Sequence, residues 1–378
     1  MKIKIKKANY KLIIILSILV VLPLIITGCV RGMTPIGWSG VVFSDSNLYT
    51  GSKEGRLIQY NLDSAKLNWS EPITITTTSG FGCSTATTAV AIYGTPALAN
   101  GLVFVAGYNG EVHAYAADNL GERWVYPRKG TLKPIIGSIV VYNDTLYFGC
   151  TDGNIYGLDV TTGDKKFQFD TGGEIWSTPA IDNNTLFIGS FDKKIYAIDL
   201  ASQSKKWDFT TAATNVAPPV TLNGVVYAGS LDRNLYALDQ ATGNLLWKYT
   251  GGNWFWAKPV IYNNIIFAPN LDNHVYGLNL TTGEKIFDYD VGGQVAAWPI
   301  IVGNQVIAGT ENGNIYALST DTGNPQMKLI ATLPQNVVIT APLAARGNQI
   351  FINGSNNVLY SVDVETGRII SSIALKAS

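Results

Sequence analysis

The tetrapeptide Tyr236-Ala237-Leu238-Asp239 has three close copies in the chain, and the spacing between the copies decides the fold. The other copies are Tyr156-Gly157-Leu158-Asp159, Tyr196-Ala197-Ile198-Asp199 and Tyr276-Gly277-Leu278-Asn279, each 40 residues from the next. Looser copies around Tyr60, Tyr115, Tyr316 and Tyr360 bring the number of units to eight. A period near 40 residues with several short strands per unit is typical of a β-propeller with one blade per repeat. We therefore predict an all-β fold: an eight-bladed propeller of four-stranded antiparallel blades.

One unit, residues 219–258, shows how a repeat would form a blade. Its predicted strands cover residues 219–222, 225–230, 234–239 and 245–250. Asn223-Gly224, between the first two strands, is a strong signal for a two-residue hairpin. Thr242-Gly243 precedes the last strand, and glycine permits a positive φ in such a turn.

A large aromatic residue follows the repeat tyrosine by eleven residues in the regular units. We expect these side chains to dock against the neighbouring blade, because a buried aromatic side chain removes roughly 150–250 Å² from water. The predicted docking residues are Trp69, Trp124, Phe167, Trp207, Trp247 and Phe287.

The first 28 residues have the pattern of a lipoprotein signal peptide. Five lysines precede an apolar stretch of 15 residues, 12–26, which is shorter than the about 20 residues of a spanning helix. The following Ile26-Thr27-Gly28-Cys29 resembles the lipobox of bacterial lipoproteins. This predicts palmitate-type lipidation at Cys29, a tether at 29–37 and a propeller at 38–378. The alternative is an uncleaved anchor helix, and both interpretations place the propeller outside the cytoplasm on a membrane.

Charge and cysteine content limit the function further. Without the leader the chain has 22 Lys and Arg against 27 Asp and Glu, a net charge of −5. Nucleic-acid binding requires a basic surface, so we expect no nucleic-acid partner. Cys83 and Cys150 belong to different repeats, and the sequence leaves open whether they form a disulfide or stay separate thiols.

Two irregularities interrupt the repeat. Trp69 and Pro96 are 27 residues apart where regular units need 12, so 15 residues are inserted within 70–94. Long loops on a rigid repeat are often functional, and a drifted loop is the alternative. The ring closes either by packing of eight whole blades or by pairing of the two end segments within one blade.

Catalytic patterns are missing from the sequence. His113 and His274 have no predicted partners for a Ser-His-Asp or zinc site. Acidic residues recur at the second turn of the repeat, where capping of backbone N–H groups competes with a calcium-binding role. These residues are Asp152, Asp192, Asp232 and Asp272, with Glu311 following. We favour capping and predict no catalytic residue, no metal and no cofactor.

Aromatic residues gather in the loops before the first strand of several units. We expect them to form a collar at one end of the central channel, where Trp offers a large apolar face to a partner protein or a glycan. The candidate partner-binding or ligand-binding residues are Trp176, Trp254, Phe255, Trp256 and Trp298, with Lys258 and Arg346 nearby. Packing between blades is the alternative role.

The segment Ala237–Trp247 resembles the tryptophan-docking motif of the PQQ-type propeller superfamily. Together with the lipobox, about eight such repeats resemble the BamB family of outer-membrane assembly lipoproteins. This resemblance implies a non-catalytic, membrane-anchored scaffold with a protein partner in the cell envelope. A propeller that binds a carbohydrate or cell-wall polymer is the alternative. A PQQ-dependent dehydrogenase is disfavoured, because members of that family carry a vicinal Cys-Cys pair that this chain lacks.

Overall fold

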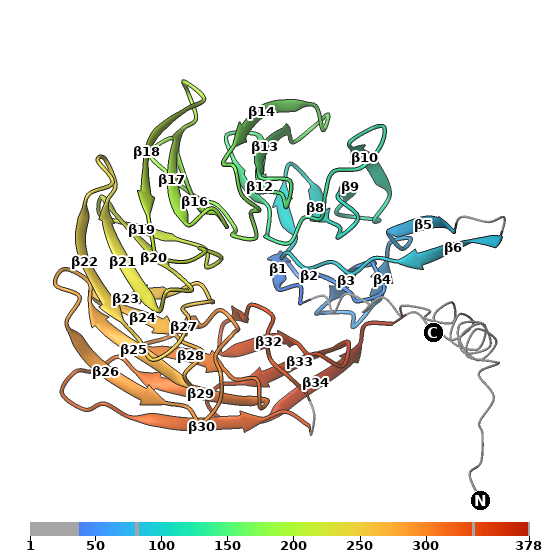
Figure 1. Cartoon of the computed structure of the whole chain (residues 1–378). Helices are drawn as coiled ribbons and strands as arrows, with labels where there is room; N and C mark the ends of the chain where they lie inside the picture. The colour runs from blue at the N-terminus through green and yellow to red at the C-terminus, as the bar shows by residue number, and fades with distance from the viewer. Residues whose placement is uncertain (1–37, 80–82, 335–336, 377–378) are drawn as a thin grey trace, which may run out of the picture. The chain divides into compact units, whose positions relative to one another are not determined.

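The computed structural model describes residues 38–79, 83–334 and 337–376, which form 34 strands and no helix. Thirty-two of these strands make eight four-stranded sheets arranged in a ring (Figure 1). The predicted eight-bladed propeller with four-stranded antiparallel blades is confirmed. The predicted signal peptide, the predicted lipidation site Cys29 and the predicted tether through residue 37 lie outside the described residues.

Each blade consists of four strands that are consecutive in the chain. Blades 1 to 4 are β1 (Val41–Ser44), β2 (Asn47–Gly51), β3 (Leu57–Asn61) and β4 (Leu67–Trp69); β7 (Ala97–Ala99), β8 (Leu102–Ala106), β9 (Val112–Ala116) and β10 (Glu122–Tyr126); β11 (Val140–Tyr142), β12 (Thr145–Gly149), β13 (Asn154–Asp159) and β14 (Lys165–Asp170); and β15 (Ala180–Asp182), β16 (Thr185–Gly189), β17 (Lys194–Asp199) and β18 (Ser204–Thr210).

Blades 5 to 8 follow the same order. They are β19 (Val220–Leu222), β20 (Val225–Gly229), β21 (Asn234–Asp239) and β22 (Leu245–Thr250); β23 (Val260–Tyr262), β24 (Ile265–Pro269), β25 (His274–Asn279) and β26 (Lys285–Asp290); β27 (Ile300–Val302), β28 (Gln305–Gly309), β29 (Asn314–Ser319) and β30 (Met327–Thr332); and β31 (Ala344–Arg346), β32 (Gln349–Asn353), β33 (Val358–Asp363) and β34 (Ile369–Ala374).

The turns of blade 5 show why the sequence folds into this unit. Asn223 and Gly224 have φ values of 50° and 79°, and they join β19 to β20 with Leu222 opposite Val225. Positive φ at both central residues matches the twist of the flanking strands, which suits Asn-Gly. In the turn before β22, the Asp239 carboxylate accepts the backbone N–H of Thr242 at 2.8 Å.

The strand registers correct the alignment of the first two repeats. Gly51 pairs with Leu57 in blade 1 as Gly229 pairs with Leu235 in blade 5. Ile58 in blade 1 and, by the same register, His113 in blade 2 therefore occupy the position of the repeat tyrosine. Tyr60 and Tyr115 lie two residues further along, so the sequence alignment was wrong by two residues there.

The indole of Trp247 joins blade 5 to blade 6. Its Nε1 donates to the carbonyl oxygen of Leu280 at 3.1 Å. Its ring lies over Gly283, where an added Cβ would lie 2.6 Å from the indole. The other docking residues behave similarly: Trp207 Nε1 donates to Gln240 O at 3.0 Å, Trp124 Nε1 donates to Val160 O at 3.1 Å, and the buried rings of Phe167 and Phe287 pack in the cores shared with blades 4 and 7.

Trp69 does not occupy the docking position of blade 1, which corrects the prediction for this residue. Gln59 pairs with Asn68 in blade 1, as Ala237 pairs with the docking residue Trp247 in blade 5. Asn68 therefore occupies the docking position, and Trp69 follows it with a side chain that is 39% exposed. The contact to blade 2 is made by other groups. Tyr49 Oη and Gln59 Nε2 both donate to Ala117 O, at 2.7 and 2.8 Å.

The ring closes by packing of two complete blades. No strand is shared between β1–β4 and β31–β34 among the described residues. A core of Val41, Leu48 and Ile58 with Phe351 and Leu359 fills the interface. Of the two modes of closure left open by the sequence, the structure shows closure by packing alone.

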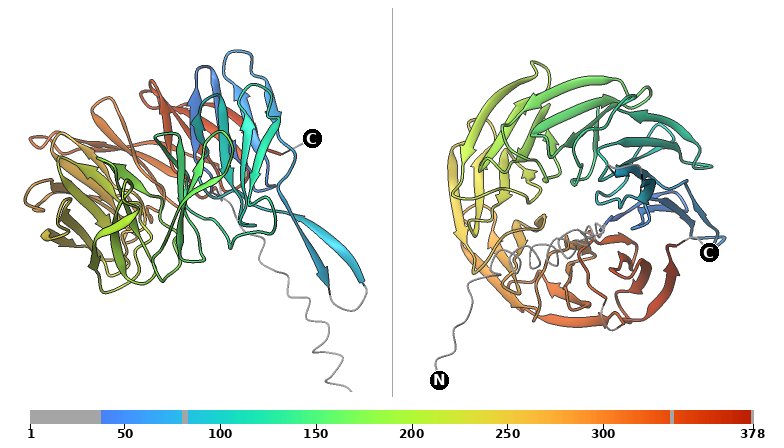
Figure 2. Two further views of the ribbon diagram at one scale, coloured as in Figure 1. Left: turned by 90° about the horizontal axis from the view of Figure 1, so that it is seen from above. Right: turned by 45° about the vertical axis from the view of Figure 1, so that its right-hand side comes forward.

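The insertion forms a hairpin of its own. β5 (Thr74–Ser79) and β6 (Cys83–Ala89) pair only with each other in the described part of the chain, and they extend away from the ring (Figure 2). Ile73 and Val90 at the base of the hairpin are buried and fix it to the core between blades 1 and 2. The hairpin leaves the ring in the connection between these blades, the same class of loop that carries the aromatic residues.

Candidate functional site

A ring of corresponding positions, one per blade, lines one end of the central channel. The residue before most of these positions donates its backbone N–H to the carbonyl group just after the second strand of the preceding blade. For example, Ile175 N–H donates to Cys150 O at 3.2 Å, and Phe255 N–H donates to Ser230 O at 3.3 Å. The side chain that follows turns into the channel. The eight residues are Trp38, Tyr93, Ile136, Trp176, Val216, Trp256, Ala296 and Thr340, and we call them the collar.

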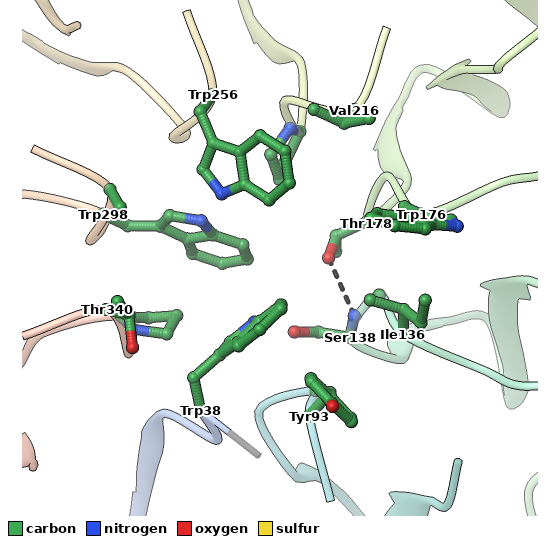
Figure 3. A pocket seen from close by; sticks show the side chains of 15 residues that line it. Trp38, Tyr93, Ile136, Ser138, Trp176, Thr178, Val216, Trp256, Trp298 and Thr340 are labelled. Carbon is green, nitrogen blue, oxygen red and sulfur yellow. Dashed lines mark hydrogen bonds between the residues drawn. The ribbon is translucent and has the colours of Figure 1, made fainter. Parts of the chain in front are cut away.

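Three of the eight collar residues are tryptophans, and they are spread around the channel. Trp256 and Trp38 point toward the middle of the channel, and Trp298 joins them (Figure 3). Trp176 meets Trp256 edge to face, with 6.4 Å between the ring centroids and an interplanar angle of 82°. The structure thus gathers three of the five candidate residues, Trp176, Trp256 and Trp298, around one hollow.

Phe255 does not belong to this surface, which corrects the prediction that it binds a partner. Its side chain is 1% exposed and packs in the core between blades 5 and 6, with Tyr276 at a ring-centroid distance of 6.2 Å. It occupies the position that Ile175 and Val295 fill with aliphatic side chains. Its neighbours Trp254 and Trp256 face away from this core because successive side chains in extended backbone point to opposite sides.

Trp254 lies outside the collar and is 44% exposed. Its carbonyl oxygen accepts the N–H of Leu271 at 3.1 Å, which fixes the loop against the second turn of blade 6. Trp254, Trp256 and Trp38 border a second hollow of about 240 Å³, completed by Leu271, Ala296, Glu311 and Thr340.

Charged groups near the collar have distinct environments. Lys258 lies over the ring of Trp298, with Nζ 5.8 Å from the centroid, and burial lowers the pKa of its ammonium group. Glu174 accepts the Nε1–H of Trp176 at 3.1 Å. Burial raises the pKa of the Glu311 carboxyl. Arg346 lies in β31 and lines a different hollow, beside Tyr60 and Ile370, so it does not join the collar.

Sequence reasoning missed Trp38 and Tyr93. Both precede blades whose connections depart from the 40-residue period, so their register with Trp176 was hidden. The dipeptide Ile92-Tyr93 carried a usable signal, because it matches Ile175-Trp176 in having a buried aliphatic residue before the aromatic one.

The recurrent acidic residues cap turns. Asp232 shows the pattern: Oδ1 accepts the N–H of Asn234 at 3.0 Å, and Oδ2 accepts the hydroxyl of Tyr236 at 2.7 Å. The same pair of bonds occurs at Asp152, Asp192 and Asp272. In the described ranges no group of three or more His, Cys, Asp or Glu side chains could hold a metal ion.

The two histidines lie on the third strands, where each contacts a carboxylate. His113 is 2.9 Å from Glu122 and 3.3 Å from Glu111, and His274 is 2.5 Å from Asp288. Cys150 is a free, buried thiol whose Sγ lies 3.2 Å from the carbonyl oxygen of Lys133, and the side chain of Cys83 lies outside the described part of the structure. Among the described residues, no helix has the length and hydrophobicity needed to cross a membrane.

Two family models match the sequence. The model described as outer membrane protein assembly factor BamB covers residues 31–222, which is 192 of the 378 residues. The model described as the β-propeller of beta-alanine-activating enzyme covers residues 135–378. The chain belongs to the PQQ-like, BamB-type β-propeller family.

Solved structures share the BamB-type fold. BamB from Moraxella catarrhalis is 18% identical, with a TM-score of 0.66 over 85% of this chain and 92% of that one. The computationally designed Ika8 protein is 17% identical, with a TM-score of 0.67 over 76% of this chain and 88% of that one. At these identities the likeness concerns the fold alone. Among curated proteins, none matches the sequence.

Proposed function

We propose that this chain is a non-catalytic scaffold, anchored to a membrane through Cys29 outside the cytoplasm, that holds another protein of the cell envelope. The observation that carries the proposal is the aromatic face around the channel mouth. Trp254 and Tyr108 are 44% and 37% exposed there, beside the half-buried rings of Trp176 and Trp256. Exposed aromatic clusters mark protein interfaces, and Trp and Tyr are enriched among the residues that contribute most binding energy.

Family membership supports the same role. The matching model is described as an outer-membrane assembly factor, and the lipobox-like segment ending at Cys29 is the type of signal that exports and anchors a protein. The hairpin β5–β6 adds a second contact surface in the same class of loop, with two strands that have no further partner in the described structure. Unpaired strand edges readily accept a strand from another chain.

Photo-crosslinking in intact cells tests the proposal. A photoreactive amino acid is placed at Trp254 and, separately, at Ile75 of the hairpin, which is 41% exposed. We expect both positions to capture the same envelope protein, identified by mass spectrometry. The control position is Leu246 on the outer strand β22, which is 52% exposed but lies away from the collar.

Capture of one protein from Trp254 and Ile75 but not from Leu246 supports the scaffold and locates its interface. Capture from Leu246 alone would place the interface on the outer strands and contradict the proposed face. If no position gives a crosslinked protein while expression and folding are unchanged, the scaffold role is wrong.

A further inference from the structure

The hollow beside the collar is lined mainly by aromatic and aliphatic side chains. Three of its lining residues are the tryptophans Trp38, Trp254 and Trp256. Trp38 precedes blade 1, whereas Trp254 and Trp256 precede blade 6, so blades 7 and 8 lie between these two blades around the ring. The remaining apolar contacts are Leu271 and Ala296. Indole rings carry a negative electrostatic face, so a site lined by three of them favours a positively charged group.

One carboxylate completes the site. Glu311 is the only ionisable residue among those that line the hollow. Its backbone N–H donates to Gln294 O at 2.9 Å, which fixes the residue at the second turn of blade 7. Within the described part of the chain, no hydrogen bond or ion pair engages its side chain. Neighbouring acidic groups accept hydrogen bonds from aromatic residues: Asp272 accepts the hydroxyl of Tyr276, and Glu174 accepts the Nε1–H of Trp176.

The same channel already holds a cation on a tryptophan. Lys258 is a half-buried lysine with its Nζ 5.8 Å from the ring centroid of Trp298. It does not line the hollow itself, so its charge does not occupy the proposed site. A positive group over an indole face is thus compatible with the local electrostatics of this end of the channel.

Size narrows the class of ligand. The hollow measures about 240 Å³, below the roughly 300–1,000 Å³ of pockets for drug-sized molecules. A hollow of this volume suits one small chemical group and is too small for a drug-sized molecule. We propose that Trp38, Trp254, Trp256 and Glu311 form an aromatic cage for one organic cation, an ammonium or guanidinium group. A free amine and a basic side chain of a bound protein present the same chemistry to the cage.

Isothermal titration of the full-length protein in detergent tests the cage with defined probes. The probes are choline and N-acetyl-arginine amide, and 3,3-dimethylbutan-1-ol is the uncharged analogue of choline. We expect saturable binding of at least one cation, with a dissociation constant in about the millimolar range. We expect no measurable binding of the alcohol. Binding of choline alone would identify a small ammonium compound as the source, and binding of the arginine probe alone would identify a basic side chain.

Two substitutions locate the site, each with a matched control. Trp254→Ala should weaken cation binding at least about fivefold, and Glu311→Gln about tenfold. Trp69→Ala removes a tryptophan of similar exposure, 39%, on the outer strand of blade 1, and Glu365→Gln removes an exposed carboxylate in blade 8. Both controls should leave binding unchanged, and thermal unfolding verifies that all four variants are folded.

The inference is independent of the scaffold role, because the titration needs no partner protein. Equal binding of choline and the neutral alcohol would overturn it, as would equal losses in Trp254→Ala and Trp69→Ala. Absence of binding by either cation would overturn it too.

Discussion

At the scale of single residues, the tripeptide Trp254-Phe255-Trp256 separates packing from surface. Composition alone marks all three as one aromatic cluster, but the extended backbone sends Phe255 into the core and its neighbours toward solvent and channel. The repeat could have shown this, because Phe255 aligns with Ile175 and Val295, both buried. The individual positions of a repeat therefore carry more information about exposure than residue type does.

Glycine in the Thr-Gly turn has two roles, a positive φ and contact with an indole, and comparison with a glycine of the Asn-Gly turn separates them. Gly283 has a φ of 73° and supports the Trp247 indole, whereas Gly224 has a φ of 79° with nothing within 4 Å of an added Cβ. Both Gly→Ala variants incur the cost of positive φ. We expect Gly283→Ala to lose about 1–3 kcal/mol more in free energy of unfolding than Gly224→Ala, because its Cβ displaces the indole. Denaturant unfolding measures the difference, and equal losses would show that the indole contact is not limiting.

At the scale of elements, the blade is the part that the sequence specifies best. Turn residues at fixed offsets, such as Asn223-Gly224 and Asp232, set the strand ends, and the observed β19–β22 match the predicted strands to within one residue. Prediction failed where a different side chain performs the same task. Tyr49 and Gln59 replace a docking tryptophan in blade 1, and no local signal distinguishes them from Trp69.

The thiol in blade 3 gives a probe for that element. Cys150 is fully buried, and burial raises the pKa of its thiol to about 12. Since the thiolate is the reactive form, N-ethylmaleimide at pH 8 should modify Cys150 at least about 100-fold more slowly in the folded protein than in denaturant. Peptide mapping by mass spectrometry measures the two rates.

The same mapping tests the pairing of cysteines. Without reductant, Cys150 should become fully modifiable on unfolding, because it is a free thiol in the structure. Resistance to modification in denaturant that reductant removes would instead show a disulfide.

At the scale of the whole molecule, the sequence gives the number of blades but not the way the ring closes. The contact between blades 8 and 1 depends on residues more than 300 positions apart, and the repeat pattern contains no information about such a pair. Asn353 illustrates the point. It stands where most blades have glycine, and its Nδ2 donates to Ser39 O, Thr50 Oγ1 and Gly51 O at 3.0 to 3.1 Å.

Closure can be weakened by one substitution. Asn353→Ala leaves buried acceptors of blade 1 without their donor, so we expect a loss of about 1–3 kcal/mol in the free energy of unfolding. Asn348→Ala, which removes an exposed amide of the same blade, should change stability by less than about 0.5 kcal/mol. Denaturant unfolding compares the two variants, and similar values would mean that the seam does not depend on Asn353.

The position of Trp38 has a consequence for orientation. This residue is the first one described in the ring, and its side chain is also a wall of the channel mouth. It lies nine positions after Cys29, and a fully extended chain spans at most about 3.3–3.6 Å per residue. With the anchor proposed at Cys29, the aromatic end of the channel stays within about 30 Å of the lipid surface. Any molecule that reaches the cage must then come within the same distance of the bilayer.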